Sequence, residues 1–168
     1  MWPVPAAGRV DQEVTMQIDV REQPTRTVAV VRREVRMDEL SAFYDTAYGE
    51  VERAVAEAGG QVVGTAVGWY HGMPTDMVDV AAGFPVEGLD AGPLAGRVEV
   101  VEMPGGRALV ALYVGPYDGL GAAWQEVEER RAQDGTDGRG DFWEEYVTDP
   151  DPDGDPAANE TLLVLPLR

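Results

Sequence analysis

The segment Phe142-Trp143-Glu144-Glu145-Tyr146 places two carboxylates among three aromatic side chains. Alternate residues of a strand share a face, so Phe142, Glu144 and Tyr146 point one way while Trp143 and Glu145 point the other. A carboxylate between two rings suits a flat cation, because the charge meets Glu144 and each ring adds about 0.5–2 kcal/mol of attraction. The segment therefore predicts a binding site for aromatic cations. The alternative is that Glu144 is an ordinary exposed strand residue.

The other face of this strand allows two interpretations. Trp143 is as consistent with core packing as with a platform for a ligand. Glu145 would be costly to bury without a partner, so we expect it near the edge of the sheet, in contact with solvent.

A second aromatic group is expected to form the opposite wall of the site. In Trp69-Tyr70-His71, Trp69 and His71 share one face and Tyr70 takes the other. One of these sets should wall the site while the other packs beneath the helices. Gly83 would leave space for a ligand, and Phe84 would cap it.

Three tyrosines and His71 have other expected positions. Tyr113 could reach the seam between the two halves of the chain from its strand. Tyr44 and Tyr48 fall on a helix, where core packing is the expected role. His71 is expected at the surface or in a loop, with proton transfer as the alternative.

The residue types exclude several chemistries. The chain has no cysteine and one histidine, which excludes thiolate catalysis, thiolate or two-histidine metal sites, and a histidine-based triad. Asp149 to Glu160 fits a calcium-loop pattern, with acids at positions 1, 3, 5 and 12 and glycine at 6. Expected flanking strands and prolines at positions 2, 4 and 8 favour an acidic hairpin loop instead. We expect no metal and no cofactor.

The charge of the chain restricts its partners. A total of 31 acidic residues against 13 basic ones gives a formal net charge of −18. Such a field repels phosphate backbones and anionic lipids and favours cationic ligands. No run of about 18 apolar residues is present, and residues 1–8 lack the features of a secretory signal. We expect a cytoplasmic protein that binds neither nucleic acid nor membranes.

The spacing of apolar residues predicts two helices and eight strands. The helices are expected at residues 37–58 and 117–132, where apolar side chains recur at steps of three and four. Pro104-Gly105-Gly106 predicts a hairpin turn between two strands. The strands are expected at 14–20, 27–32, 62–71, 77–86, 97–103, 107–114, 142–148 and 161–167.

The same order of elements occurs twice. We therefore expect an α+β fold, in which duplicated βαββ units at about 27–86 and 107–168 form one antiparallel sheet. Both helices should cover one face, leaving a ligand cleft on the other face at the seam. Residues 1–13 are expected to be a flexible tail, and residues 14–168 a single domain.

Several segments, in the right order, resemble the GyrI-like effector-binding family. The resemblance covers nearly everything after residue 14. It implies a pseudo-twofold sheet with two helices and a cleft that binds bulky aromatic or cationic compounds. It also implies that Glu144, with Tyr146, lies at the base of that cleft, whereas Glu145 stands where the family usually has an apolar residue. The segments are Asp79–Val86, Pro104–Tyr117, the helix with Trp124, Trp143–Pro150 and Leu163–Arg168.

The resemblance implies three candidate functions. Many relatives carry the domain behind a DNA-binding module as multidrug-sensing regulators, but the chain has no room for one before Val14 and is expected to be a stand-alone member. It would then sequester drugs, a role in antibiotic resistance. Other relatives hydrolyse the cyclopropane ring of genotoxic natural products, and Glu144 and Tyr146 would then be catalytic. The third candidate is modulation of gyrase through the acidic surface.

Overall fold

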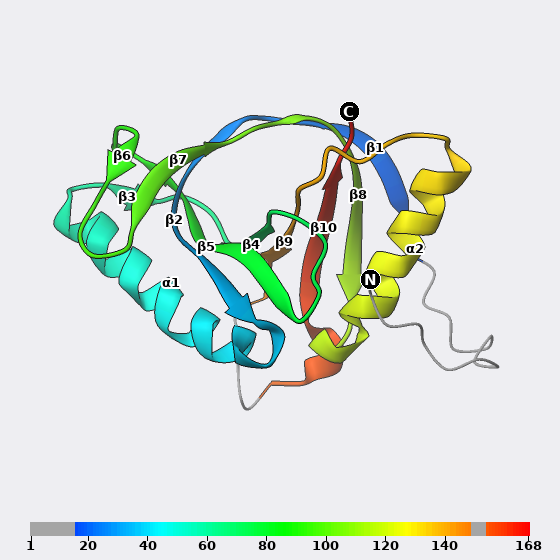
Figure 1. Cartoon of the computed structure of the whole chain (residues 1–168), viewed down its shortest axis with the longest axis horizontal. Helices are drawn as coiled ribbons and strands as arrows, with labels where there is room; N and C mark the ends of the chain where they lie inside the picture. Colours follow the sequence, from blue (N-terminus) through cyan, green and yellow to red (C-terminus); the bar gives the residue numbers. More distant parts are fainter. Residues whose placement is uncertain (1–15, 149–153) are drawn as a thin grey trace.

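A computed structural model describes residues 16–148 and 154–168 of the chain (Figure 1). The expected tail at residues 1–13 and the aspartates 149, 151 and 153 of the calcium pattern lie outside the described residues. The strands are β1 (Ile18–Gln23), β2 (Arg26–Arg36), β3 (Gln61–Val62), β4 (Ala66–Tyr70), β5 (Met77–Glu87), β6 (Gly92–Pro93), β7 (Glu99–Met103), β8 (Gly106–Val114), β9 (Phe142–Tyr146) and β10 (Glu160–Pro166). The helices are α1 (Leu40–Glu57) and α2 (Leu120–Gln133), with 3-10 turns η2 (Met37–Glu39), η3 (Tyr117–Gly119) and η4 (Pro156–Ala158).

The strands form one ten-stranded antiparallel sheet, and the predicted fold class is confirmed. Its order is β1-β8-β10-β9-β4-β5-β2-β7-β6, with β3 paired to β5 beside this path. Each half of the chain runs strand, helix, strand, strand, as β2-α1-β4-β5 and as β8-α2-β9-β10. The two halves meet where β4 pairs with β9 near the middle of the sheet. None of the described helices has the length and apolar character needed to span a membrane.

The predicted hairpin at residues 104–106 is wrong. β7 pairs with β2 and β6, whereas β8 pairs with β1 and β10. The Gly105 N–H donates to Oγ1 of Thr25 at 2.9 Å, and a Cβ at Gly105 would collide with the carbonyl oxygen of Gln23. The 104–105 connection therefore runs beside the β1–β2 connection. Together the four strands make a long ribbon that arches from one half of the molecule to the other (Figure 1).

Several strands differ from their predicted bounds, among them the first strand and the one expected at 62–71. The first begins at Ile18 rather than at residue 14, within the described part of the chain. The single strand expected at 62–71 is divided into β3 and β4. At the break, the Val63 N–H donates to the Pro85 carbonyl, but Pro85 of β5 has no N–H with which to continue the ladder.

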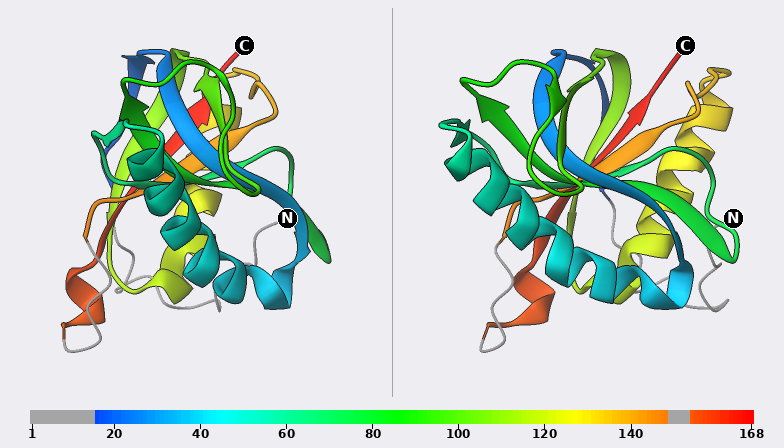
Figure 2. Two further views of the ribbon diagram at one scale, coloured as in Figure 1. Left: turned by 90° about the vertical axis from the view of Figure 1, so that its left-hand side faces the viewer. Right: turned by 60° about the vertical axis from the view of Figure 1, so that its left-hand side comes forward.

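The strands of the sheet curve strongly (Figure 2). Each face of the sheet carries its own apolar core. On the helix face, side chains of both helices pack on the sheet, as Phe43 and Val51 of α1 and Val127 of α2 do. On the opposite face, side chains of the curved strands pack against one another. Each fully buried large side chain contributes about 1.5–3 kcal/mol. The opposite-face core consists of Val28, Val30, Val67, Trp69, Ala81, Met103, Ala108, Val110, Trp143 and Val164.

Candidate functional site

The side chain of Glu144 is buried in the middle of the sheet and is 2% exposed. The Tyr146 hydroxyl donates to its Oε1 at 2.6 Å, and the Trp124 indole N–H donates to its Oε2 at 2.7 Å. The Tyr70 hydroxyl donates to Oε1 over a longer distance of 3.4 Å. Both carboxylate oxygens are thus satisfied without any basic side chain, which is unusual for a buried acid.

The central strand pair brings Glu144 and its tyrosines to one face. Gly68 of β4 lies directly opposite Glu144 of β9 in the register. Tyr70 and Tyr146 lie two residues along their strands from this pair, so both side chains share the face of Glu144.

The helices supply one ring each from equivalent positions. Both follow a three-residue 3-10 turn and begin at a leucine, Leu40 in α1 and Leu120 in α2. The fifth residue of α1 is Tyr44, and the fifth of α2 is Trp124. The Tyr44 hydroxyl lies 2.7 Å from the Tyr70 hydroxyl and 3.4 Å from that of Tyr146. We call Glu144, Tyr70, Tyr146, Tyr44 and Trp124 the Glu144 cluster.

Three more rings lie outside the Glu144 cluster, and we call Tyr48, Phe84 and Tyr117 the outer rings. Tyr48 stacks on Tyr44 with ring centroids 5.4 Å apart and meets Phe84 edge-on at 5.5 Å. Tyr117, which is 41% exposed, meets the ring of Tyr146 edge-on at 6.0 Å. Tyr44, Tyr48, Phe84 and Tyr146 are half-buried, so an aromatic layer separates Glu144 from solvent.

The burial of the cluster changes its acid–base properties. Burial raises the pKa of Glu144 above its ordinary value of 4.5, and the hydrogen bonds from Tyr146, Trp124 and Tyr70 act in the opposite direction. Burial also raises the pKa values of Tyr44, Tyr70 and Tyr146 well above 10, assisted by the neighbouring carboxylate. The tyrosines therefore remain protonated donors, and Glu144 is the group whose charge can change.

The structure separates the sequence-predicted site residues into two groups. Phe142, Glu144, Tyr146, Tyr70 and Phe84 lie on the helix face. Phe142 is buried there, stacked on Tyr70 at 5.1 Å. Glu144 thus faces the helices, whereas the cleft was expected on the opposite face; that face is filled by its own core because the sheet curves so strongly.

Trp69 and Trp143 belong to the opposite-face core, on the other side of the sheet from the side chain of Glu144. They are partners in the β4–β9 register, one strand position from Gly68 and Glu144. The indole N–H of Trp69 donates to Asp141 at 2.9 Å. Strand alternation makes these two tryptophans core residues.

Glu145 was expected near an edge of the sheet, in contact with solvent, and this prediction is wrong. It lies in β9 between two other strands, and its side chain is 13% exposed. Oε2 of Glu145 accepts from the Arg26 guanidinium at 2.9 Å and from the Trp143 indole N–H at 3.0 Å. Arg26 lies on β2, three strands from β9 in the order of the sheet, and this partner is what permits the burial of Glu145.

His71 and Tyr113 are also apart from the cluster. The His71 ring lies 4.3 Å from that of Trp69, and burial lowers the pKa of His71. Its Nε2 is buried without a hydrogen-bond partner among the described residues. Tyr113 is on the helix face, but its hydroxyl donates to the carbonyl of Pro116 at 2.8 Å.

Sequence reasoning missed the contributions of the helices to the cluster. Trp124 was noted only as part of a helix that resembles the family, and Tyr44 and Tyr48 were assigned to core packing. Tyr44 and Trp124 each stand at the same number of residues after the leucine that begins their helix. This equal spacing was the signal in the sequence that the two rings occupy equivalent positions. Tyr117 gave no such signal.

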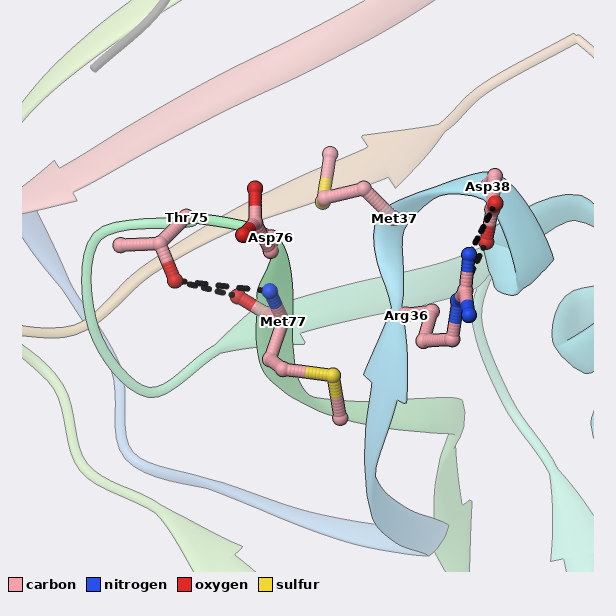
Figure 3. Close-up of a pocket in the computed structure, with 6 residues that line it drawn as sticks. All are labelled: Arg36, Met37, Asp38, Thr75, Asp76 and Met77. Carbon is pink, nitrogen blue, oxygen red and sulfur yellow. Dashed lines mark hydrogen bonds and ion pairs between the residues drawn. The ribbon is translucent and has the colours of Figure 1, made fainter.

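A surface hollow of about 450 Å³ lies apart from the cluster, where the end of β2 meets the turn before β5 (Figure 3). All six side chains that line it are exposed, so it offers no place to bury an apolar ligand. Among residues 16–148 and 154–168, no group of three or more acidic or histidine side chains is arranged to hold a metal ion. The hollow is lined by Arg36, Met37, Asp38, Thr75, Asp76 and Met77.

Comparison with known proteins gives one family match. The family described as GyrI-like small molecule binding domain matches residues 16–168. No curated protein sequence matches the chain.

Solved structures similar to this one include the C-terminal domain of EcmrR, with a TM-score of 0.79 and 18% identity over 92% of this chain and 99% of that chain. In an EcmrR–DNA complex, the match has a TM-score of 0.78 and 20% identity over 90% of this chain, which spans 57% of the length of EcmrR. A hydrolase from Listeria innocua has a TM-score of 0.67 and 14% identity, over 95% of this chain and 96% of that chain. SAV2435 bound to tetraphenylphosphonium has a TM-score of 0.63 and 12% identity, over 91% and 94%. At these identities the likeness establishes the fold.

Proposed function

The chain belongs to the GyrI-like small molecule binding domain family, and from this premise we propose that it binds bulky aromatic cations between its two helices, with Glu144 at the base of the site. The observation that carries the proposal is a carboxylate that is 2% exposed and has aromatic and phenolic neighbours but no basic partner. Burying a carboxylate without a positively charged partner costs free energy, and a bound cationic ligand offsets that cost.

The surroundings of Glu144 determine what kind of cation fits. Tyr44, Tyr48 and Tyr146 present ring faces and edges around the carboxylate, and each well-placed ring contributes about 0.5–2 kcal/mol to the binding of a cation. A charge spread over a large apolar body loses little hydration when it is buried, so such a cation gains most from this site. The net charge of −18 draws cations to the protein before they reach the site.

Access to Glu144 requires side chains to move. Tyr117 is 41% exposed and packs edge-on against Tyr146. It is more exposed than the half-buried rings around it, so its displacement uncovers the least buried surface. Turning Tyr117 and Tyr146 aside exposes Oε1 of Glu144, while Trp124, 1% exposed, continues to hold Oε2. The ligand then replaces these two rings as the cover of the carboxylate.

The structure of SAV2435 with tetraphenylphosphonium supports an aromatic cation as the ligand class, since that protein shares this fold. Tetraphenylphosphonium is accordingly the probe for the test. Titration calorimetry should detect its binding to the wild-type chain at micromolar concentrations. Glu144→Gln should weaken the affinity about 100-fold, because the attraction between unit charges about 5 Å apart is about 3 kcal/mol at an effective dielectric constant of 20.

The matched control is Glu129→Gln, which removes one carboxylate from an exposed position of α2. It should change the affinity less than about twofold, because exposed charges are screened by salt. Equal affinity of Glu144→Gln and the wild type for tetraphenylphosphonium would show that Glu144 is not the anchor.

Hydrolysis is the second candidate function. The same fold occurs in a hydrolase from Listeria innocua, and a carboxyl with a raised pKa beside two phenol donors is suited to proton transfer. Glu144 would activate water or protonate the leaving group, and Tyr146 would stabilise developing negative charge during the opening of a strained cyclopropane ring. Product analysis after incubation with a spirocyclopropyl alkylating agent tests this function, and unchanged compound leaves binding alone.

A further inference from the structure

Thr161 carries a buried hydroxyl next to the Glu144 cluster. Its side chain is 0% exposed, and its Oγ1 has no hydrogen-bond partner among the described residues. Leaving a buried hydroxyl unpaired costs about 1–3 kcal/mol. Valine has nearly the same shape without that cost, so packing alone does not explain a threonine at this position.

The register places Thr161 on the helix face between two tyrosines. In the β10 strand, Thr161 is the partner of Tyr113 on β8 and of Tyr146 on β9. Leu163, two residues further along, belongs to the helix-face core and is the partner of Glu144. Thr161 is therefore the diagonal neighbour of Glu144 on the same face, at a typical spacing of about 7–8 Å.

The hydroxyls of both flanking tyrosines are already engaged. Tyr113 donates to the carbonyl of Pro116 at 2.8 Å, and Tyr146 donates to Glu144 at 2.6 Å. In the proposed function the ligand turns Tyr146 aside, and this movement would open the space next to Thr161. Its hydroxyl is then a free donor and acceptor on the floor of the site.

We propose that Thr161 is a second polar anchor of the site, which hydrogen-bonds a neutral carbonyl, amide or hydroxyl group of an aromatic cation whose charge lies over Glu144. This inference rests on the proposed function and narrows its ligand class. The preferred ligands are aromatic cations that carry a neutral hydrogen-bonding group about 7–8 Å from the charge, the spacing of the two anchors. Cations that carry hydrocarbon groups alone use one anchor and leave Thr161 unpaired.

Two matched probes test this inference by titration calorimetry. One is tetraphenylphosphonium, and the other is the same cation with a carboxamide on the para carbon of one phenyl ring. The wild-type chain should bind the carboxamide probe about two- to tenfold more tightly, as one added hydrogen bond predicts. Thr161→Val should abolish this preference while leaving the affinity for tetraphenylphosphonium within about twofold of wild type. Thr161→Ser, which keeps the hydroxyl, should retain the preference.

The outcomes separate this inference from the proposed function. If Thr161→Val binds tetraphenylphosphonium and still prefers the carboxamide probe as strongly as the wild type does, Thr161 is not an anchor. The proposed function would then still stand. Binding of neither probe by the wild type would overturn both. The melting temperature of free Thr161→Val should equal or exceed that of the wild type, and a fall of several degrees would show that the hydroxyl has a structural partner instead.

Discussion

Gly68 lies directly opposite Glu144 in the β4–β9 pair, and the space that a side chain would fill holds the tyrosine hydroxyls of the Glu144 cluster. A Cβ at Gly68 would lie 2.5 Å from the hydroxyl oxygen of Tyr44 and 2.9 Å from that of Tyr146. The backbone of Gly68 does not have a positive φ, so the requirement for glycine here is one of space. The close packing of the Tyr44 and Tyr146 hydroxyls in the Glu144 cluster depends on this residue.

Gly68→Ala should therefore displace the hydroxyls of Tyr44 and Tyr146. We expect the free energy of unfolding to fall by about 1–3 kcal/mol, the usual cost of overpacking, and the affinity for tetraphenylphosphonium to change with it. Urea unfolding and calorimetry measure the two effects. Gly49→Ala is the matched control, since a Cβ there meets nothing within 4 Å, and alanine in a helix should stabilise the protein by about 0.5–1 kcal/mol. Equal stability of Gly68→Ala and the wild type would contradict the packing argument.

The raised pKa of Glu144 gives a second prediction, for stability against pH. Because burial favours the neutral acid, the stability associated with Glu144 is fully present below its ordinary pKa of 4.5 and is lost as the pH rises through the raised value. Glu144→Gln is neutral at every pH. The difference in free energy of unfolding between Glu144→Gln and the wild type should therefore move in favour of the variant as the pH rises through this window.

Urea unfolding of both proteins at a series of pH values measures this difference, with Glu129→Gln as the control for the loss of one carboxylate at an exposed site. A difference that stays constant from below pH 4.5 to neutral pH would mean that the pKa of Glu144 is the same in the folded and unfolded chain.

The binding of a cation should be linked to the release of a proton from Glu144. A positive charge beside the carboxylate favours its ionised form and lowers its pKa. At pH values below the raised pKa of the free site, each binding event should release up to one proton, and the affinity should increase with pH. Calorimetry in two buffers with different ionisation enthalpies counts the protons. Glu144→Gln should release none, and an equal release by this variant would assign the proton to another group.

Local patterns predicted the parts of the site that lie on one strand. Alternation in the segment 142–146 indicated that Glu144 and Tyr146 share a face, and the Tyr146 hydroxyl does donate to Glu144. The same alternation placed Trp143 and Glu145 together on the other face, where the indole of Trp143 donates to Glu145. Period-two parity needs only the strand itself, so it holds wherever the strand is correctly identified.

Contacts between distant elements were not predictable in this way. Trp124 reaches Glu144 because α2 docks at a particular position on the sheet, and Arg26 reaches Glu145 because the sheet curves. The Pro-Gly-Gly sequence signals a tight connection but carries no information on which strands pair on either side of it. The prediction that Glu145 contacts solvent was wrong because its partner, Arg26, is 119 residues away in the chain and cannot be identified from the local pattern.

The positions of the tryptophans lead to a last prediction, on fluorescence. Among the tryptophans that the structure describes, Trp124 contacts Glu144, while Trp69 and Trp143 lie in the core of the opposite face. A ligand over Glu144 should therefore quench the fluorescence of Trp124 far more than that of the other two.

In a Trp2→Phe background, Trp124→Phe should remove most of the quenching at saturating tetraphenylphosphonium. Trp143→Phe should retain it, although the loss of the bond to Glu145 lowers stability by about 1 kcal/mol. Calorimetry on each variant establishes saturation, since Trp124→Phe also removes a donor to Glu144. Undiminished quenching in Trp124→Phe would place the ligand on the other face of the sheet.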